Sequence, residues 1–151
     1  MAFATFVDMG NDLMTWLTAH GLSGHRFLEL AFAAMVAILF LQSGLDKALN
    51  WKGNLDWLTG HFAKSPLKGT VPLLLPVITA VELSAGSCAA IGLVQVALHG
   101  DATLGAWGCA LGALAITMLF FGQRVAKDYA GAASLVPYFL LCAGGMWVFM
   151  Q

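Results

Sequence analysis

The stretch that decides the fold is VPLLLPVITAVELSAGSCAAIGLVQVAL, at Val71–Leu98. It is longer than the roughly 20 apolar residues that cross the hydrocarbon of a bilayer, so it predicts a membrane-spanning helix. A single acid, Glu82, lies within it. A charged side chain near the middle of such a helix costs about 3 kcal/mol on insertion scales, and such residues usually face a bundle interior and mark a functional site. We therefore expect Glu82 to point into a helical bundle.

The composition of the whole chain points to a membrane protein. Of the 151 residues, 60% are hydrophobic and 10% are charged, whereas about 25% of the residues of soluble domains are charged. Seven Lys and Arg residues and a net charge of −1 give no basic surface of the kind that nucleic acids bind. The sequence thus predicts an integral protein of the lipid bilayer and excludes nucleic acid as a partner.

The apolar segments predict an all-α fold, a four-transmembrane-helix bundle in which residues 1–151 form a single membrane domain. The spans are expected at about 27–45, 71–98, 102–121 and 129–150. Before the first span, the helical spacing of Met9, Leu13 and Trp16 opposite Asp8 and Asp12 predicts an N-terminal amphipathic helix in the membrane interface. We expect this helix to pack on the mouth of the bundle. A second, short interfacial helix is expected between spans 1 and 2.

The basic residues predict the orientation of the bundle. Six of them fall in or beside the first and third connections between spans: Lys47, Lys52, Lys64, Lys68, Arg124 and Lys127. Only Arg26 lies on the other side. Because Lys and Arg concentrate in cytoplasmic connections, we expect both termini on the periplasmic side of a bacterial inner membrane.

That orientation gathers polar residues at the cytoplasmic mouth of the bundle. The candidate pocket consists of Glu82, Gln42, Asp46, Lys47, Gln123, Arg124, Lys127 and Asp128. A nearby Lys or Arg would keep Glu82 ionised and tie helices together, whereas apolar surroundings would keep it neutral and able to donate a hydrogen bond. His61, on the short interfacial helix, is a further candidate, although a His at a membrane edge is more often a surface or hydrogen-bonded residue than a ligand.

The three cysteines give no sign of redox or metal chemistry. Cys88, Cys109 and Cys142 lie in three different apolar segments, without a Cys-x-x-Cys pair or metal-ligand spacing. We expect them to be small buried apolar side chains. The sequence also lacks a haem, flavin or metal-binding pattern, so it predicts no intrinsic cofactor. An electron-transfer role would then depend on a partner.

Four short stretches resemble the DoxX family of small four-helix membrane proteins. They are FLQSGLDK at Phe40–Lys47, VELSAG at Val81–Gly86, IGL at Ile91–Leu93 and GQRVAKDYAGA at Gly122–Ala132. The resemblance implies that the motif residues of the family lie at Gly44, Lys47, Glu82, Gln123 and Arg124. Family members often carry an Arg near the start of the first span, where this chain has Glu29 and only the earlier Arg26.

The resemblance also implies a link to membrane redox chemistry. The family is named for a subunit found with a terminal quinol oxidase, and related proteins include the small membrane subunit of thiosulfate:quinone oxidoreductase. The first hypothesis is an accessory or interaction subunit of a membrane redox or respiratory complex, with quinone as candidate ligand and a membrane protein or a second copy as partner. Two alternatives are a self-sufficient quinone-binding or quinone-linked oxidoreductase component, and a small transporter or proton pathway. In the remaining hypothesis, Glu82 forms a purely structural ion pair.

Overall fold

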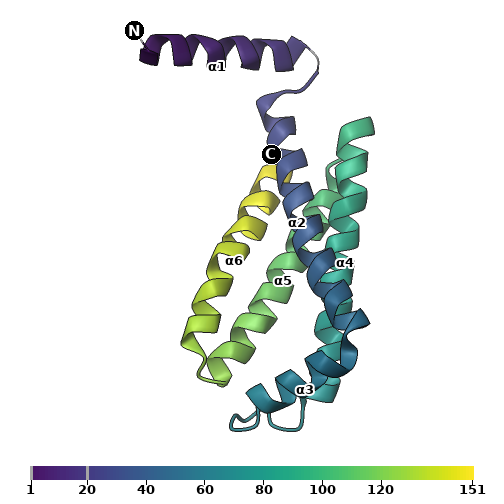
Figure 1. Ribbon diagram of the computed structural model, residues 1–151. Helices are drawn as coiled ribbons and strands as arrows, with labels where there is room; N and C mark the ends of the chain where they lie inside the picture. Colours follow the sequence, from purple (N-terminus) through teal and green to yellow (C-terminus); the bar gives the residue numbers. More distant parts are fainter. Residues whose placement is uncertain (1, 20) are drawn as a thin grey trace.

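The computed structural model describes residues 2–19 and 21–151, and within these ranges the chain forms six helices and no strand. The helices are α1 (Ala2–Ala19), α2 (Gly24–Leu49), α3 (Trp51–His61), α4 (Val71–His99), α5 (Thr103–Val125) and α6 (Tyr129–Phe149). Figure 1 shows α2, α4, α5 and α6 as a bundle, with α1 across one end and α3 at the other. We call the end at α1 the outer end and the end at α3 the inner end. The predicted all-α four-helix fold is confirmed.

The four bundle helices are each long and apolar enough to cross a membrane. Along the bundle, α2 packs on α4, α4 on α5 and α5 on α6, while α2 also meets α5 and α6. This arrangement buries only a minority of each apolar segment inside the protein and leaves large aliphatic and aromatic side chains on the outside. Such a surface is stable in hydrocarbon but not in water. The chain is therefore an integral membrane protein.

Helix α2 extends beyond the expected span at both ends, and α5 continues four residues beyond its expected end, to Val125. The Ser23 hydroxyl accepts the backbone N–H of Arg26 at 3.1 Å, which starts α2 at Gly24. At its other end α2 continues through Lys47 to Leu49, so the polar run after the first span is still helical. The carboxylate of Asp128 accepts the backbone N–H of Gly131 at 2.8 Å and starts α6 in the same way.

Glycine lets the bundle helices approach closely. A Cβ on Gly108 would lie 2.7 Å from the backbone nitrogen of Ala89 on α4, and a Cβ on Gly112 would lie 2.6 Å from the ring of Phe40 on α2. Gly108 and Gly112, which form a GxxxG pair, thus lie on a packing face that points into the bundle interior. Cys109 and Cys142 are buried in the same core as expected, whereas Cys88 is only half-buried.

The N-terminal helix α1 lies across the axis of the bundle and projects beyond it (Figure 1). Met9, Leu13 and Trp16 are 64%, 56% and 58% exposed, and the acids of the opposite face, Asp8 and Asp12, are also exposed. The predicted packing of this apolar face on the mouth of the bundle is thus wrong. Met9 and Leu13 are exposed to the surrounding medium, as in a helix that lies in a membrane interface.

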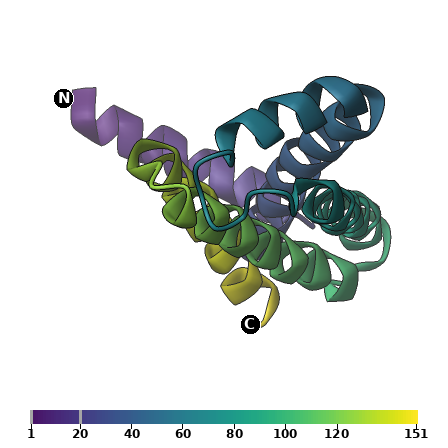
Figure 2. The same cartoon turned by 90° about the horizontal axis from the view of Figure 1, so that it is seen from below.

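The second predicted short helix, α3, crosses the inner end of the bundle, as Figure 2 shows from below. Leu55 and Leu58 on one face are partly buried against the core. Trp57, on another face, is 61% exposed, and Trp51, in the first turn, is 37% exposed. The helix therefore covers the inner end of the bundle and presents aromatic rings outward.

Candidate functional site

An ion pair between α2 and α4 lies at the centre of the candidate site. The Lys47 ammonium Nζ lies 2.9 Å from Glu82 Oε2 and 3.2 Å from Oε1, to which it donates a hydrogen bond. The Glu82 side chain is 1% exposed, whereas that of Lys47 is 15% exposed. The structure thus confirms that Glu82 faces the bundle interior, and it gives the acid a cation partner from the first span.

Ser43 completes this cluster. Its hydroxyl donates to Glu82 Oε1 at 3.2 Å and accepts from Lys47 Nζ at 2.7 Å. Ser43 and Lys47 are four residues apart on α2, so both side chains point from the same face toward α4. Between them, Gly44 allows close approach, because a Cβ there would lie 2.7 Å from Leu83 Cδ2. Sequence reasoning did not single out Ser43, although its spacing from Lys47 could have identified it.

The two carboxylate oxygens of Glu82 are held differently. Oε1 accepts hydrogen bonds from both Ser43 and Lys47, whereas Oε2 is buried and receives none. Although Oε2 is the oxygen nearer to the ammonium, the direction of this contact does not suit a hydrogen bond, so it is a charge contact only. One acceptor at this buried site therefore has spare hydrogen-bonding capacity.

Beside the ion pair lies a pocket of about 220 Å³ at the inner end of the bundle. It is lined by Lys47, Leu58, Phe62, Leu67, Val71, Leu74, Ile78, Met118, Leu119, Phe121, Gly122 and Gln123. Lys47 and Gln123 are the polar members, and the walls come from α3, the segment after it, α4 and α5. Leu74 and Phe121, which lie on the wall, are also 37% and 62% exposed. Part of the pocket wall, on α4 and α5, is therefore exposed on the outside of the bundle.

A second polar cluster ties α3 to the turn between α5 and α6. His61 Nε2 lies 2.9 Å from Gln123 Oε1 and 3.9 Å from Asp128 Oδ2, and the His61 ring stacks on Trp57 with centroids 5.0 Å apart. The Asp128 carboxylate also caps α6. His61 is thus a hydrogen-bonded residue that places α3 over the pocket.

The structure does not gather all the predicted residues in one pocket. Gln42, Asp46 and Lys127 are exposed, and Asp46 contacts Asn54 on α3 at 3.4 Å. Arg124 is exposed and lies 4.6 Å from the centre of the Tyr129 ring. Two clusters result, one around Lys47 and Glu82 and one around His61 and Gln123, with the apolar pocket between them.

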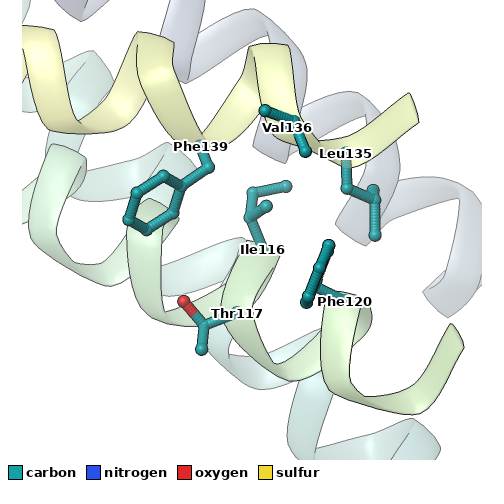
Figure 3. Close-up of a pocket in the computed structure, with 6 residues that line it drawn as sticks. All are labelled: Ile116, Thr117, Phe120, Leu135, Val136 and Phe139. Carbon is teal, nitrogen blue, oxygen red and sulfur yellow. The ribbon is translucent and has the colours of Figure 1, made fainter. Parts of the chain in front are cut away.

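A second cavity of about 260 Å³ lies between α5 and α6, where the side chains of Ile116, Thr117, Phe120, Leu135, Val136 and Phe139 converge (Figure 3). The Thr117 hydroxyl donates to the Ala113 carbonyl of its own helix at 2.7 Å. The lining therefore presents almost only apolar atoms, and this cavity offers no group for chemistry.

Arg26, the single basic residue predicted at the outer end, has a structural partner. Its guanidinium donates to the Val96 carbonyl from Nη2 at 2.6 Å and from Nε at 3.2 Å.

Comparison of the chain with protein-family models, with curated proteins and with solved structures found no match.

Proposed function

We propose that this integral membrane protein is a DoxX-like accessory subunit of a bacterial membrane redox complex, and that its inner-end pocket holds a quinone for that complex. The observation that carries the proposal is an apolar pocket with two polar lining residues, Gln123 and Lys47, of which Lys47 is also the ion-pair partner of Glu82. Ligand pockets commonly combine apolar walls with a small number of polar groups that fix orientation.

The chemistry of the pocket matches a quinone in two respects. Leu58, Phe62 and Leu119 form walls for an apolar body, and a lipid-dissolved molecule would enter between α4 and α5. Lys47 and Gln123 carry hydrogen-bond donors that suit carbonyl oxygens. The redox cofactor itself would belong to a partner subunit, because the sequence carries no pattern that binds one.

The orientation proposed from the basic residues agrees with this site. The pocket, α3 and most Lys and Arg residues share the inner end, which would face the cytoplasm, with both termini at the periplasm. A quinone would then bind at the cytoplasmic leaflet of a bacterial inner membrane.

The transporter alternative has less support. Between the two ends, the core that the structure describes contains Val36, Phe40, Ala85 and Ala89, each at most 1% exposed. A proton or solute pathway would need polar groups or water along this length. The other alternative, a self-sufficient quinone-linked component, would use the same pocket but would act without a partner subunit.

The proposal is tested by blocking the pocket. Leu74→Trp adds bulk at the pocket wall, and Leu73→Trp is its matched control, because Leu73 is 70% exposed and does not line the pocket. Each protein is purified in mild detergent from quinone-containing membranes, its quinone is quantified by chromatography, and bound subunits are identified by cross-linking and mass spectrometry.

We expect stoichiometric quinone with the wild type and Leu73→Trp, and loss of quinone with Leu74→Trp, while a redox subunit copurifies with all three. Quinone without a partner subunit would favour the self-sufficient alternative. Absence of both from the folded wild-type protein would refute the proposal.

A further inference from the structure

The inner end of the bundle carries a set of free positive charges. Its exposed cations, here called the inner basic rim, are Lys52, Lys64, Lys68, Arg124 and Lys127. Among the residues that the structure describes, the ion pairs are His25–Glu29, Lys47–Glu82 and His61–Asp128, and none includes a member of the rim. These cations therefore have no counter-ion among the described residues.

The acids at the same end do not neutralise the rim. Asp128 caps α6 and faces His61, and Asp46 contacts Asn54. Asp56 is exposed on α3. Three acids thus face five rim cations, since the charge of Lys47 is balanced by Glu82.

The outer end of the bundle has fewer basic side chains than the inner end, and its basic side chain is engaged within the protein. Its one basic side chain, Arg26, is committed to the carbonyls of Val96 and Ala97 at the end of α4. Asp101 is fully exposed there, and the backbone N–H of Thr103 holds the pKa of this carboxyl below its usual range. In the described part of the chain, free positive charge is thus confined to the inner end.

Most of the rim lies at or beside the inner ends of the membrane-spanning helices. Arg124 is in the last turn of α5, Lys127 lies two residues before α6, and Lys68 lies three residues before α4. Trp57 and Tyr129, 61% and 57% exposed, accompany them. Aromatic rings of this kind mark the membrane interface, where basic side chains meet the phosphates of anionic lipids.

We propose that the inner basic rim binds the headgroups of anionic phospholipids. The rim belongs to three separate parts of the chain, which Figure 2 shows spread across the inner end: α3, the connection after it, and the end of α5 with the turn that follows. This distribution fits headgroups arranged around the bundle better than a single patch for an acidic protein. The inference does not depend on the quinone site or on a redox partner.

The test uses the full chain in phosphatidylcholine vesicles with a trace of spin-labelled phosphatidylglycerol or spin-labelled phosphatidylcholine. Electron spin resonance measures the fraction of each labelled lipid that the protein immobilises. We expect a preference for phosphatidylglycerol of about fivefold, the effect of one basic contact at the membrane surface. Salt at about 1 M should abolish it, because the Debye length falls to about 3 Å.

Two matched variants separate charge from structure. Lys64→Gln with Lys68→Gln should lower the preference, whereas Lys64→Arg with Lys68→Arg should keep it. Equal immobilisation of both lipids by the wild type would overturn the proposal, as would a preference that the Gln variant retains in full. Loss of a copurifying acidic protein in the Gln variant, without any lipid preference in the wild type, would assign the rim to that protein instead.

Discussion

Arg26 of α2 and Val96 of α4 are joined by two hydrogen bonds at the outer end of the bundle, where Nη2 and Nε share one carbonyl oxygen at 2.6 and 3.2 Å. The Lys47–Glu82 ion pair joins the same two helices at the inner end. Helix α2 thus contributes a basic side chain to α4 at both ends of their contact. The two links differ, because one caps a helix terminus and the other pairs a buried acid.

Arg26→Ala should destabilise the bundle by about 1–2 kcal/mol. The variant loses charge-assisted hydrogen bonds to the last carbonyls of α4 and a favourable cation at a helix C-terminus. Arg26→Lys should recover part of this loss, since it keeps the charge without the fork of donors. Reversible unfolding in mixed detergent micelles measures both effects. Equal stability of Arg26→Ala and wild type would show that water replaces the guanidinium without cost.

Replacing Lys47 should lower the stability of the bundle more than replacing Glu82. Lys47→Met leaves the Glu82 carboxylate, which is 1% exposed, without a counter-ion, and should cost about 3–5 kcal/mol. Glu82→Gln should cost about 1–2 kcal/mol, because Lys47 is partly exposed and can turn toward the inner mouth, and because the amide can keep the contact with Ser43.

The double variant Lys47→Met with Glu82→Leu should be close to wild type in stability, since apolar side chains often replace a buried ion pair without loss. The cycle is measured by the same unfolding titration, with quinone content as a separate readout. The single variant Glu82→Leu completes this double-mutant cycle. If the costs of Lys47→Met and Glu82→Leu simply added in the double variant, the pair would not be coupled. If both single variants had normal stability and retained quinone normally, Glu82 would contribute neither to stability nor to quinone binding.

Gly108→Ala should destabilise the contact between α4 and α5 by about 1–3 kcal/mol. The added Cβ would lie 2.7 Å from the backbone nitrogen of Ala89, so the helices must separate and lose packing. Gly144→Ala is the matched control within a span, because its Cβ would meet only the ring of Phe32 at an ordinary 3.5 Å. Thermal unfolding in detergent compares the two variants. Similar melting temperatures would mean that the α4–α5 contact adjusts freely.

The sequence was sufficient to predict the elements of this fold. Hydrophobic length identified the four bundle helices. It also placed Glu82 inside the bundle. These predictions succeeded because they depend on the length and periodicity of single helices.

The predictions that failed depend on how helices lie against one another. The spacing of four residues places Ser43 on the same face of α2 as Lys47. Its contact with Glu82, and the outward position of Gln42, depend on the rotation of α2 against α4. The position of α1 likewise depends on its orientation against the bundle. Its apolar face was predicted to pack on the mouth of the bundle, but Leu13 on that face is exposed. The partner of Arg26, a backbone carbonyl, has no sequence signature at all.

His61→Ala should loosen α3 over the pocket while it leaves the spans intact. His61 supplies the hydrogen bond from α3 to Gln123 and faces Asp128, and its ring stacks on Trp57. Loss of one hydrogen bond, about 0.5–1.5 kcal/mol, should raise amide hydrogen exchange in α3 about 2- to 10-fold, with α4 and α5 unchanged. Asp56→Asn, on the exposed side of α3, is the control and should exchange as the wild type does. Faster exchange in all helices would mean that His61 supports the whole bundle, and no change in α3 would mean that Leu55 and Leu58 hold it without this contact.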